Sequence, residues 1–405
     1  MKNIFKLLAF LPLLTACDDL FEPALENNRD LEAMYKEPSY AQGILANAYI
    51  ILPYETSPTS DLATDDAVTN EISSNYLRMA TGSWTANNNP VSQWQNRFNA
   101  IQYINLFLEN VDKVEWAKDE RISTMFLDRL KGEAYGLRAL HMYYLLRAHG
   151  GKIADGTLMG VPIILKSEGP DADFNHARAT YSDCVKQIME DADKAIELLP
   201  LDYKKFADSE IPEKYKNIGV TNASDYRRVC GEEYRGLMSG RIALAVRAQT
   251  ALLAASPAFQ SGSGMTWEQA ADYAAEIIEK ANGGGGCGLD ADGLEWYTLA
   301  DKDYGTGGSP AEVIWRSSTD DNNTLETANF PPSLYGNGRV NPTQNLVDAF
   351  PMANGYPISE TSGNYDAENP YDNRDPRLAK YIVYNGSKQG PSDTEIITGT
   401  YRRCE

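Results

Sequence analysis

The sequence predicts a mainly α-helical protein, in which a tetratricopeptide-like helical superhelix is followed by a loop-rich C-terminal region with a few short strands. Apolar residues recur every three or four positions through most of the first 282 residues, which is the spacing of amphipathic helices. From residue 283 onward Gly, Pro, Asn and Asp become frequent, and the apolar runs become short. Helices in consecutive antiparallel pairs pack side by side into a superhelix, although the repeat period here is not strict.

The helical part of the chain divides into segments that each keep one apolar face. These segments are residues 39–52, 94–113, 123–149, 181–199, 236–256 and 266–281. The clearest is 123–149, which Gly150-Gly151 ends. Thr180 precedes the next helix as an N-cap, with an aspartate three residues later. Beyond the helices, the short apolar runs 312–315 and 381–384 are predicted to be strands.

The N-terminus carries an export signal. The sequence Leu14-Thr15-Ala16-Cys17 has the form of a bacterial lipobox, where a signal peptide is removed and the new N-terminal cysteine is lipidated. Positively charged and apolar stretches precede it, and the apolar run is too short to span a bilayer. Residues 1–16 are therefore predicted to be a signal peptide and Cys17 the lipidated residue. Residues 17–35 are expected to form an acidic stalk.

The charge balance excludes two classes of partner. The chain has 57 acidic and 37 basic residues and a formal net charge of −20. Nucleic-acid binding through phosphate contacts needs clustered Lys and Arg, so it is not expected here. Adhesion to an anionic membrane surface by charge is excluded for the same reason. A lipid anchor would hold the protein instead, since each buried CH₂ group contributes about 0.8 kcal/mol.

Motifs for enzyme chemistry are scarce, so we expect no enzyme activity. The chain has three histidines, His141, His149 and His176, with no HExxH motif and no metal-ligand spacing among them. His141 lies on the apolar side of its helix and is expected to be a hydrogen-bonded core residue. No cofactor is expected, although Asp290-Ala291-Asp292-Gly293 leaves a single structural Ca²⁺ open. Acidic residues are abundant, and a glycosidase pair among them is not visible in a sequence.

The cysteines other than Cys17 are far apart. They are Cys184, Cys230, Cys287 and Cys404, and none forms a CxxC pair. Isolated structural thiols are the expected state, while oxidation in an exported protein remains an alternative.

Two loop segments have the residue types that bind sugars. Sugars stack their C–H patches on Trp and Tyr rings, and their hydroxyl groups hydrogen-bond to Asn, Asp and Arg. The first segment, just before the helix at 94–113, contains Tyr76, Arg78, Trp84, Asn87, Asn88 and Asn89. The second contains Asn322, Asn323 and Tyr335. The alternative for Trp84 is that it only packs its loop onto the body. Packing is also expected of Trp94, Trp116, Trp267, Trp296 and Trp315.

An ordered set of motifs resembles the SusD/RagB family of outer-membrane lipoproteins of the Bacteroidetes. In chain order they are Gly132-Glu133-Ala134-Tyr135-Gly136-Leu137-Arg138-Ala139-Leu140, Tyr143-Tyr144-Leu145-Leu146-Arg147, Gly160-Val161-Pro162-Ile163, the residues Ile188, Asp191 and Ala195 with Leu198-Leu199-Pro200, Ala251-Leu252-Leu253-Ala254-Ala255-Ser256-Pro257, Asn341-Pro342-Thr343-Gln344-Asn345-Leu346-Val347-Asp348-Ala349-Phe350 and Asn373-Arg374-Asp375-Pro376-Arg377-Leu378. The set covers essentially the whole mature chain. No single motif is decisive, but their order is specific.

The resemblance implies a fold and a site. It implies a helical body of four tetratricopeptide-like units, here residues 36–282, and a loop-rich RagB/SusD C-terminal region, here residues 283–405. In starch-binding members a Trp with an Asn three residues later sits in the loop before the second long helix, and Trp84 and Asn87 reproduce that spacing. Family members generally continue past the Arg-Asp-Pro-Arg segment, so the C-terminal region is expected to be truncated.

The resemblance also implies a function. Family members are surface lids over TonB-dependent transporters, to which they present glycan or sometimes peptide. We therefore expect a non-catalytic, lipid-anchored protein of the outer membrane, facing the cell exterior, with oligosaccharide as ligand and a SusC-like transporter as partner. A peptide-binding member of the family and a surface glycoside hydrolase are the alternatives. The identity and linkage of the glycan depend on loop geometry and are left open.

Overall fold

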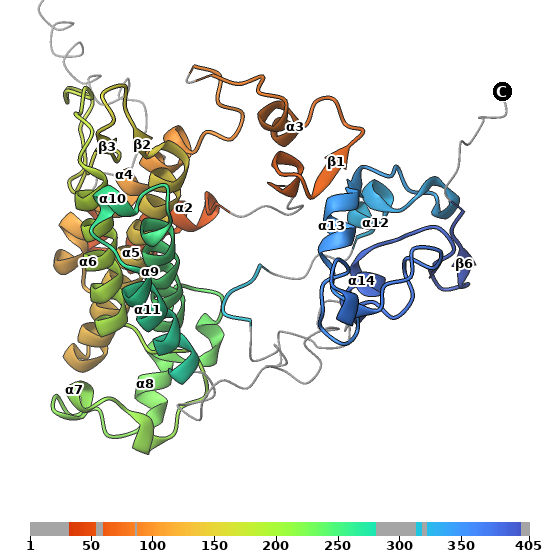
Figure 1. The fold of residues 1–405 in the computed structure, drawn as a ribbon. Coiled ribbons are helices and arrows are strands. Elements are labelled where there is room, and N and C mark those ends of the chain that lie inside the picture. The colour runs from red at the N-terminus through yellow and green to blue at the C-terminus, as the bar shows by residue number, and fades with distance from the viewer. Residues whose placement is uncertain (1–31, 54–59, 86, 281–312, 318–321, 398–405) are drawn as a thin grey trace, which may run out of the picture.

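The computed structural model describes residues 32–53, 60–85, 87–280, 313–317 and 322–397, and helices dominate these ranges (Figure 1). The helices are α1 (Ala33–Lys36), α2 (Pro38–Ile50), α3 (Asn75–Ala80), α4 (Trp94–Asn110), α5 (Glu120–His149), α6 (Tyr181–Leu198), α7 (Glu213–Lys216), α8 (Ala223–Cys230), α9 (Gly240–Ala255), α10 (Gln260–Ser263), α11 (Trp267–Lys280), α12 (Thr324–Asn329), α13 (Gln344–Ala349) and α14 (Pro376–Tyr381). The strands are β1 (Ala67–Thr69), β2 (Gly151–Lys152), β3 (Leu158–Met159), β4 (Val340–Pro342), β5 (Lys388–Gln389) and β6 (Thr394–Glu395). The prediction of a mainly α-helical fold with a few short strands is confirmed.

The long helices form one packed array. Helix α2 packs on α4, α4 on α5, α5 on α6, and α9 on both α6 and α11. Successive long helices are therefore neighbours in space, as short connections require. Figure 1 shows these helices side by side, running roughly along one direction. None of the helices among the described residues combines the length and the apolar composition needed to cross a membrane.

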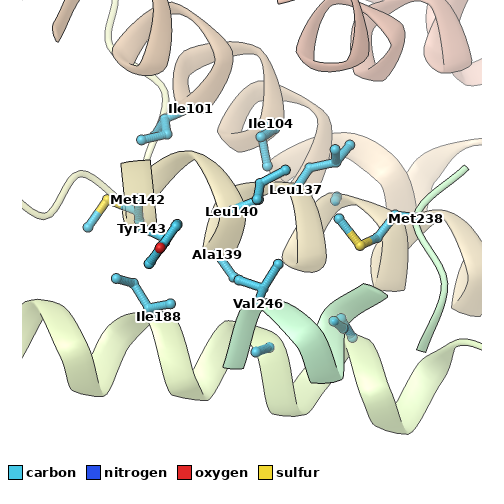
Figure 2. Close-up of a cluster of buried hydrophobic side chains, with 14 of the residues drawn as sticks. Ile101, Ile104, Leu137, Ala139, Leu140, Met142, Tyr143, Ile188, Met238 and Val246 are labelled. Carbon is cyan, nitrogen blue, oxygen red and sulfur yellow. The ribbon is translucent and has the colours of Figure 1, made fainter. Parts of the chain in front are cut away.

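The core lies where α5 is enclosed by its neighbours (Figure 2). Ile104 of α4, Leu137 of α5, Ile188 of α6 and Val246 of α9 belong to one buried cluster. Each such side chain contributes about 1.5–3 kcal/mol when fully buried. Helix α5 lies deep in this array, since seventeen of its thirty residues are buried. Its apolar and small residues therefore face helices on more than one side.

Capping residues set where the long helices begin. Thr180 caps α6 as predicted, since its hydroxyl accepts a hydrogen bond from the Asp183 N–H at 3.0 Å. Helix α5 begins three residues earlier than the predicted residue 123, because the Asp119 carboxylate accepts from the Arg121 N–H at 2.9 Å. Helix α9 begins at Gly240 rather than at 236, because the Ser239 hydroxyl caps it. In both helices the polar N-cap residue marks the observed helix start more accurately than the spacing of the apolar residues does.

The predicted stalk is too long at its C-terminal end. Residues 33–36 form α1, and Met34 is completely buried in the main core. The Tyr35 hydroxyl donates to the Asn110 side chain at 3.0 Å. The packed body therefore begins at α1 rather than at residue 36, because Met34 supplies apolar surface that the array covers. The remainder of the predicted stalk, residues 17–31, lies outside the described residues, as does the predicted signal peptide.

The two strand predictions in the C-terminal region are wrong. Residues 313–317 have no regular structure, and the described part of the run 312–315 forms no strand. Tyr381 is the last residue of α14, and residues 382–384 follow it without strand pairing. Asp375 caps this helix, and Pro376 occupies its first turn, where proline is favoured. Asp375 and Pro376 are a helix start signal upstream of this apolar run, and the strand prediction did not take them into account.

A second, smaller core organises the C-terminal region. Val347, Leu378 and Ile382 form its buried cluster. The Arg374 guanidinium holds the surrounding chain, since it donates to the carbonyl oxygens of Val347 and Phe350, each at 2.7 Å. These elements are blue in Figure 1.

The chain segment between α2 and α4 is tied to this C-terminal region. Strand β1 pairs antiparallel with β4, with Ala67 opposite Pro342 and Thr69 opposite Val340. The Asn70 side chain adds a hydrogen bond to the Asn337 carbonyl at 3.0 Å. A division of the chain at residue 282 therefore does not describe the fold completely, because residues 67–70 pair across it.

Candidate functional site

The first predicted ligand segment folds as a short helix followed by a tight reverse turn. The Ser74 hydroxyl caps α3, and the Ser83 N–H donates back to the Arg78 carbonyl at 2.8 Å. The chain then reverses, because Thr85 and Asn88 exchange backbone hydrogen bonds of 3.3 and 3.0 Å. The Asn89 carboxamide accepts from the Val91 N–H at 3.0 Å, which fixes the exit of the turn. The local hydrogen bonds thus define the backbone of this loop.

Trp84 and Asn87 flank Thr85, the first bridge residue of this turn, along the chain. Trp84 directly precedes Thr85 and is 46% exposed, while Asn87 lies between the two bridge residues and is exposed. Nearly half of the surface of Trp84 is therefore open to solvent. An indole face and a carboxamide on one short turn are the groups that a sugar ring can stack on and hydrogen-bond to.

The other residues of the first segment lie nearby in the chain. Tyr76 is half-buried and Arg78 is exposed, both on α3, and Asn88 is exposed in the turn. Asn88 has its backbone groups engaged with Thr85, so its side chain is what it offers to a ligand. The structure therefore places the residues of this segment on α3 and the adjoining turn, within one continuous stretch of chain.

The second predicted segment lies at α12 and the turn after it. The Asn322 carboxamide oxygen accepts from the Thr324 N–H at 2.9 Å, which occupies part of its hydrogen-bonding capacity. Asn323 is the N-cap of α12 but makes no side-chain cap bond. Tyr335 follows Pro332–Leu334 with a φ of 63° and is 96% exposed. A tyrosine rarely adopts a positive φ, so this turn holds an aromatic ring outward at a conformational cost.

The two segments belong to connected parts of the fold. The Asn70 carboxamide receives a hydrogen bond from Arg339 at 3.3 Å, beside the β1–β4 pair. Asn70 lies between β1 and α3 in the chain, and Arg339 lies between the Tyr335 turn and β4. Figure 1 labels β1 and α3. In the described ranges, no hydrogen bond or ring contact joins Trp84 or Asn87 to Tyr335. The structure therefore shows two patches linked by a small sheet.

Two of the remaining tryptophans pack against the body, as predicted. Trp116 is buried and donates to the Val111 carbonyl at 3.2 Å, and Trp315 packs against the main core and donates to Gly236 at 2.8 Å. Trp94 meets Phe98 edge-on, with ring centroids 4.9 Å apart, but is 43% exposed. Trp267 is 49% exposed on α11. Trp296 lies outside the described residues.

The strongest pKa shifts belong to groups buried inside the helical body. Burial raises the pKa of Glu133, although the Arg129 guanidinium at 3.3 Å opposes this shift. The Tyr49 hydroxyl donates to Glu133 at 2.8 Å, and burial raises the pKa of Tyr49 well above its usual value. Glu133 is buried and Tyr49 is partly buried against the main core, so their shifted pKa values reflect core packing.

His141 is a core residue, as predicted. Its Nε2 hydrogen-bonds to the Ala48 carbonyl at 3.1 Å, and its Nδ1 lies 3.2 Å from the Arg97 guanidinium. Burial first, and the Arg97 charge second, lower the pKa of His141 to about 3. Arg97 itself is a buried cation that the sequence patterns did not single out, and burial lowers its pKa to about 10.

The described residues contain no cluster of three His, Cys, Asp or Glu side chains that could hold a metal ion. The Asp290–Gly293 segment considered for Ca²⁺ lies outside them. Cys184 and Cys230 are free and buried, which confirms the prediction of isolated thiols for these two residues. Cys17, Cys287 and Cys404 lie outside the described residues.

The fold is a packed helical array joined to a loop-rich region that carries an exposed aromatic turn. Residues 25–214 match the family model described as "Starch-binding associating with outer membrane", and residues 311–401 match the model of the SusD family. The chain belongs to the SusD/RagB family. No curated protein matches the chain.

Solved structures agree with this fold. A SusD-like protein from Bacteroides fragilis NCTC 9343 is 19% identical with a TM-score of 0.63, over 91% of this chain and 64% of its own. A SusD-like carbohydrate-binding protein from the same strain is 20% identical with a TM-score of 0.60, over 90% of this chain and 62% of its own. A SusD superfamily protein from Bacteroides vulgatus ATCC 8482 is 19% identical with a TM-score of 0.50, over 79% and 62% of the two chains. The chain thus spans less than two thirds of each of these proteins.

Proposed function

We propose that this protein captures oligosaccharide at the outer membrane and passes it to a SusC-like TonB-dependent transporter without cleaving it. The proposal is supported by the family model described as starch-binding and associating with the outer membrane. A solved relative of the same fold is described as a SusD-like carbohydrate-binding protein. Both relationships point to glycan as the ligand class.

One observation on this chain carries the proposal: the half-exposed indole of Trp84 and the exposed carboxamide of Asn87 both belong to the segment closed by the Thr85–Asn88 backbone hydrogen bonds. An indole face offers a flat apolar surface for the C–H side of a pyranose ring. The Asn87 carboxamide has both donors and an acceptor for the hydroxyl groups at the ring edge. The Thr85–Asn88 bonds restrain the backbone here, which lowers the part of the ordering cost that comes from the backbone.

The second patch supports a ligand longer than one sugar. Tyr335 presents an almost fully exposed ring, and Asn323 has a side chain that caps no helix end. Two aromatic patches linked through β1 and β4 are consistent with an extended oligosaccharide that contacts both. The Arg78 guanidinium on α3 adds donors for hydroxyl groups near the first patch.

The anchoring part of the proposal rests on the lipobox at Cys17. A lipidated N-terminal cysteine would hold the ligand-binding patches at the membrane, near a transporter that takes up what they capture. Replacing Cys17 with Ser in cells should move the protein from the membrane fraction to the soluble fraction. Unchanged membrane association of this variant would contradict the lipid anchor.

Binding without turnover is the result that tests the proposal. Titration calorimetry with a panel of oligosaccharides of different linkage should give saturable binding to at least one of them. Chromatography of the same mixtures after long incubation should recover the oligosaccharide intact. We also expect no cofactor requirement, so EDTA should leave the affinity unchanged. Released product would support the hydrolase alternative, and saturable binding of peptides but of no glycan would support the peptide-binding alternative.

A further inference from the structure

The last helix pair of the array leaves an apolar groove on the surface. Helices α9 and α11 pack against each other, and the groove between them has a volume of about 280 Å³. Its lining is almost wholly apolar. It comprises Ala248, Gln249 and Leu252 from α9 with Trp267, Ala270, Ala271 and Ala274 from α11. Leu252 is 55% exposed and lies beside the half-exposed Trp267, so the two form part of one apolar patch at the surface.

Helix α11 has a second apolar face besides the one that packs on α9. Ala270 is buried against the body, whereas Trp267, Ala271, Ala274 and Ile278 are all exposed. These four residues follow a spacing of four, three and four, so they form one stripe along the helix. The stripe is about 17 Å long at 1.5 Å per residue, which equals three turns of a helix. In a helical array the outer face of the last helix is normally polar, and within the described residues α11 is the last long helix of this array, so an apolar stripe on its outer face is unusual.

Acidic side chains border this stripe on one side. Glu268, Asp272 and Glu279 are exposed and lie about 100° around α11 from the stripe, on the side away from α9. Within the described residues none of the three has an ion-pair partner, whereas Glu276 on the same helix pairs with Arg247 and Lys280. The α9 side of the groove is neutral, since Gln249 and Leu252 form it. The groove therefore combines an apolar floor with negative charge on a single flank.

We infer that the α9–α11 groove docks an amphipathic helix of a partner protein, whose apolar stripe covers Trp267, Ala271 and Leu252. A helix fits because the groove runs between two helices and the exposed apolar stripe on α11 extends over three turns. The partner helix carries Lys or Arg along the flank that meets Glu268, Asp272 and Glu279, because opposite charges at the rim steer and orient association. The α9 flank is neutral, so it requires no charge on the partner helix. The basic flank of the partner helix therefore lies on the α11 side, and this fixes its rotation in the groove.

A pair of synthetic peptides tests this inference on the full chain. Both are fluorescein-labelled 21-residue helices with Leu at spacings of three and four, and one flank carries Lys in the first peptide and Glu in the second. Fluorescence anisotropy should show the Lys peptide binding at least tenfold more tightly than the Glu peptide. The affinity of the Lys peptide should fall as salt is raised, since the rim charges are exposed.

Variants of the groove locate the binding. Leu252→Asp should weaken the Lys peptide at least tenfold, while Leu325→Asp, at another half-exposed leucine on α12, should leave it unchanged. The double change Asp272→Lys and Glu279→Lys should reverse the preference between the two peptides. Thermal melting of each variant checks that the fold is retained, and both changes lie at exposed positions.

Three outcomes would overturn the inference. Equal affinities for the two peptides would remove the role of the acidic flank. Absence of binding, or binding that Leu252→Asp does not weaken, would remove the groove as the docking site. Sedimentation that shows a dimer of this chain, dissociated by Leu252→Asp, would assign the groove to a second copy instead of a partner helix. None of these results bears on the glycan patches, which lie on other elements.

Discussion

Arg138 and Asp191 form a bidentate ion pair in the centre of the helical array. The Arg138 Nε and Nη2 atoms donate to the two Asp191 carboxylate oxygens at 2.7 and 2.8 Å, and both side chains are buried. The third Arg138 donor reaches the Asn105 side chain at 2.9 Å, and Asn105 in turn donates to the Ile164 carbonyl at 2.9 Å. One guanidinium therefore connects α4, α5, α6 and the loop that follows β3.

Removing one charge of this pair should be costly. Asp191→Asn leaves Arg138 buried beside a neutral side chain, so we expect a loss of about 3–5 kcal/mol in the free energy of unfolding. Urea denaturation of the native chain and of the variant measures this loss. The double change Arg138→Met and Asp191→Leu removes both charges and should cost less than Asp191→Asn alone. A loss below about 1 kcal/mol for Asp191→Asn would show that the pair is not a major contributor.

Two glycines in helices should respond to alanine in opposite directions. A Cβ at Gly136 would lie 2.6 Å from the Met238 Cγ, so Gly136→Ala should destabilise the chain by about 1–3 kcal/mol through overpacking. Gly43 in α2 has nothing within 4 Å of that position, so Gly43→Ala should stabilise by about 0.5–1 kcal/mol through helix propensity. Thermal or urea unfolding of both variants gives the comparison. Equal effects would contradict the close approach of α5 to Met238.

The buried imidazole predicts a pH dependence. The pKa of His141 is lowered to about 3 in the folded chain, whereas an unfolded histidine titrates near about 6.5. Between these values the unfolded chain binds more protons than the folded chain, so folding stability is full above about pH 6.5 and is lost as the pH falls towards 3. The contribution of His141 to this loss is at most about 1.4 kcal/mol per pH unit.

His141→Gln isolates that contribution. The variant should be less stable than the native chain at pH 7, because it disturbs the hydrogen bonds to Ala48 and Arg97. Its stability should fall less steeply than that of the native chain between pH 6.5 and 4, so the difference between the two should shrink. Urea midpoints at several pH values measure this difference. A difference that stays constant with pH would contradict the buried neutral state of His141.

The apolar period was enough to predict the long helices and failed for short ones. Helices such as α4 and α6 repeat their apolar face over four or more turns, so local spacing identifies them. Helices α8 and α13 have eight and six residues, which is too short for a period to appear. Their caps were the available signal, since Asn222 accepts from the Asp225 N–H at 2.9 Å and Thr343 caps α13.

The relations between distant residues could not be predicted from local pattern. The β1–β4 pair joins residues more than 270 positions apart, and nothing in either three-residue strand specifies the other. Sequence reasoning placed Arg138 in a family motif but did not identify Asp191 as its partner. The same holds for the α9–α11 groove, because Trp267 was expected to pack and its exposure depends on what surrounds α11 in space. The loop residues Trp84 and Asn87 were selected by residue type and spacing, and their common turn depends on the Thr85–Asn88 bridge.

The central claim is that Trp84 is the anchor of a glycan site, and a matched pair of variants tests it most directly. Trp84 and Trp267 have nearly equal exposed fractions, 46% and 49%, and lie on different elements. Calorimetric titration of the best oligosaccharide should show Trp84→Ala weakening the affinity by about 1–3 kcal/mol, which corresponds to roughly 5- to 150-fold. Trp267→Ala should bind with the native affinity. Native affinity in Trp84→Ala, with the fold intact by circular dichroism, would contradict the account and move the glycan site elsewhere.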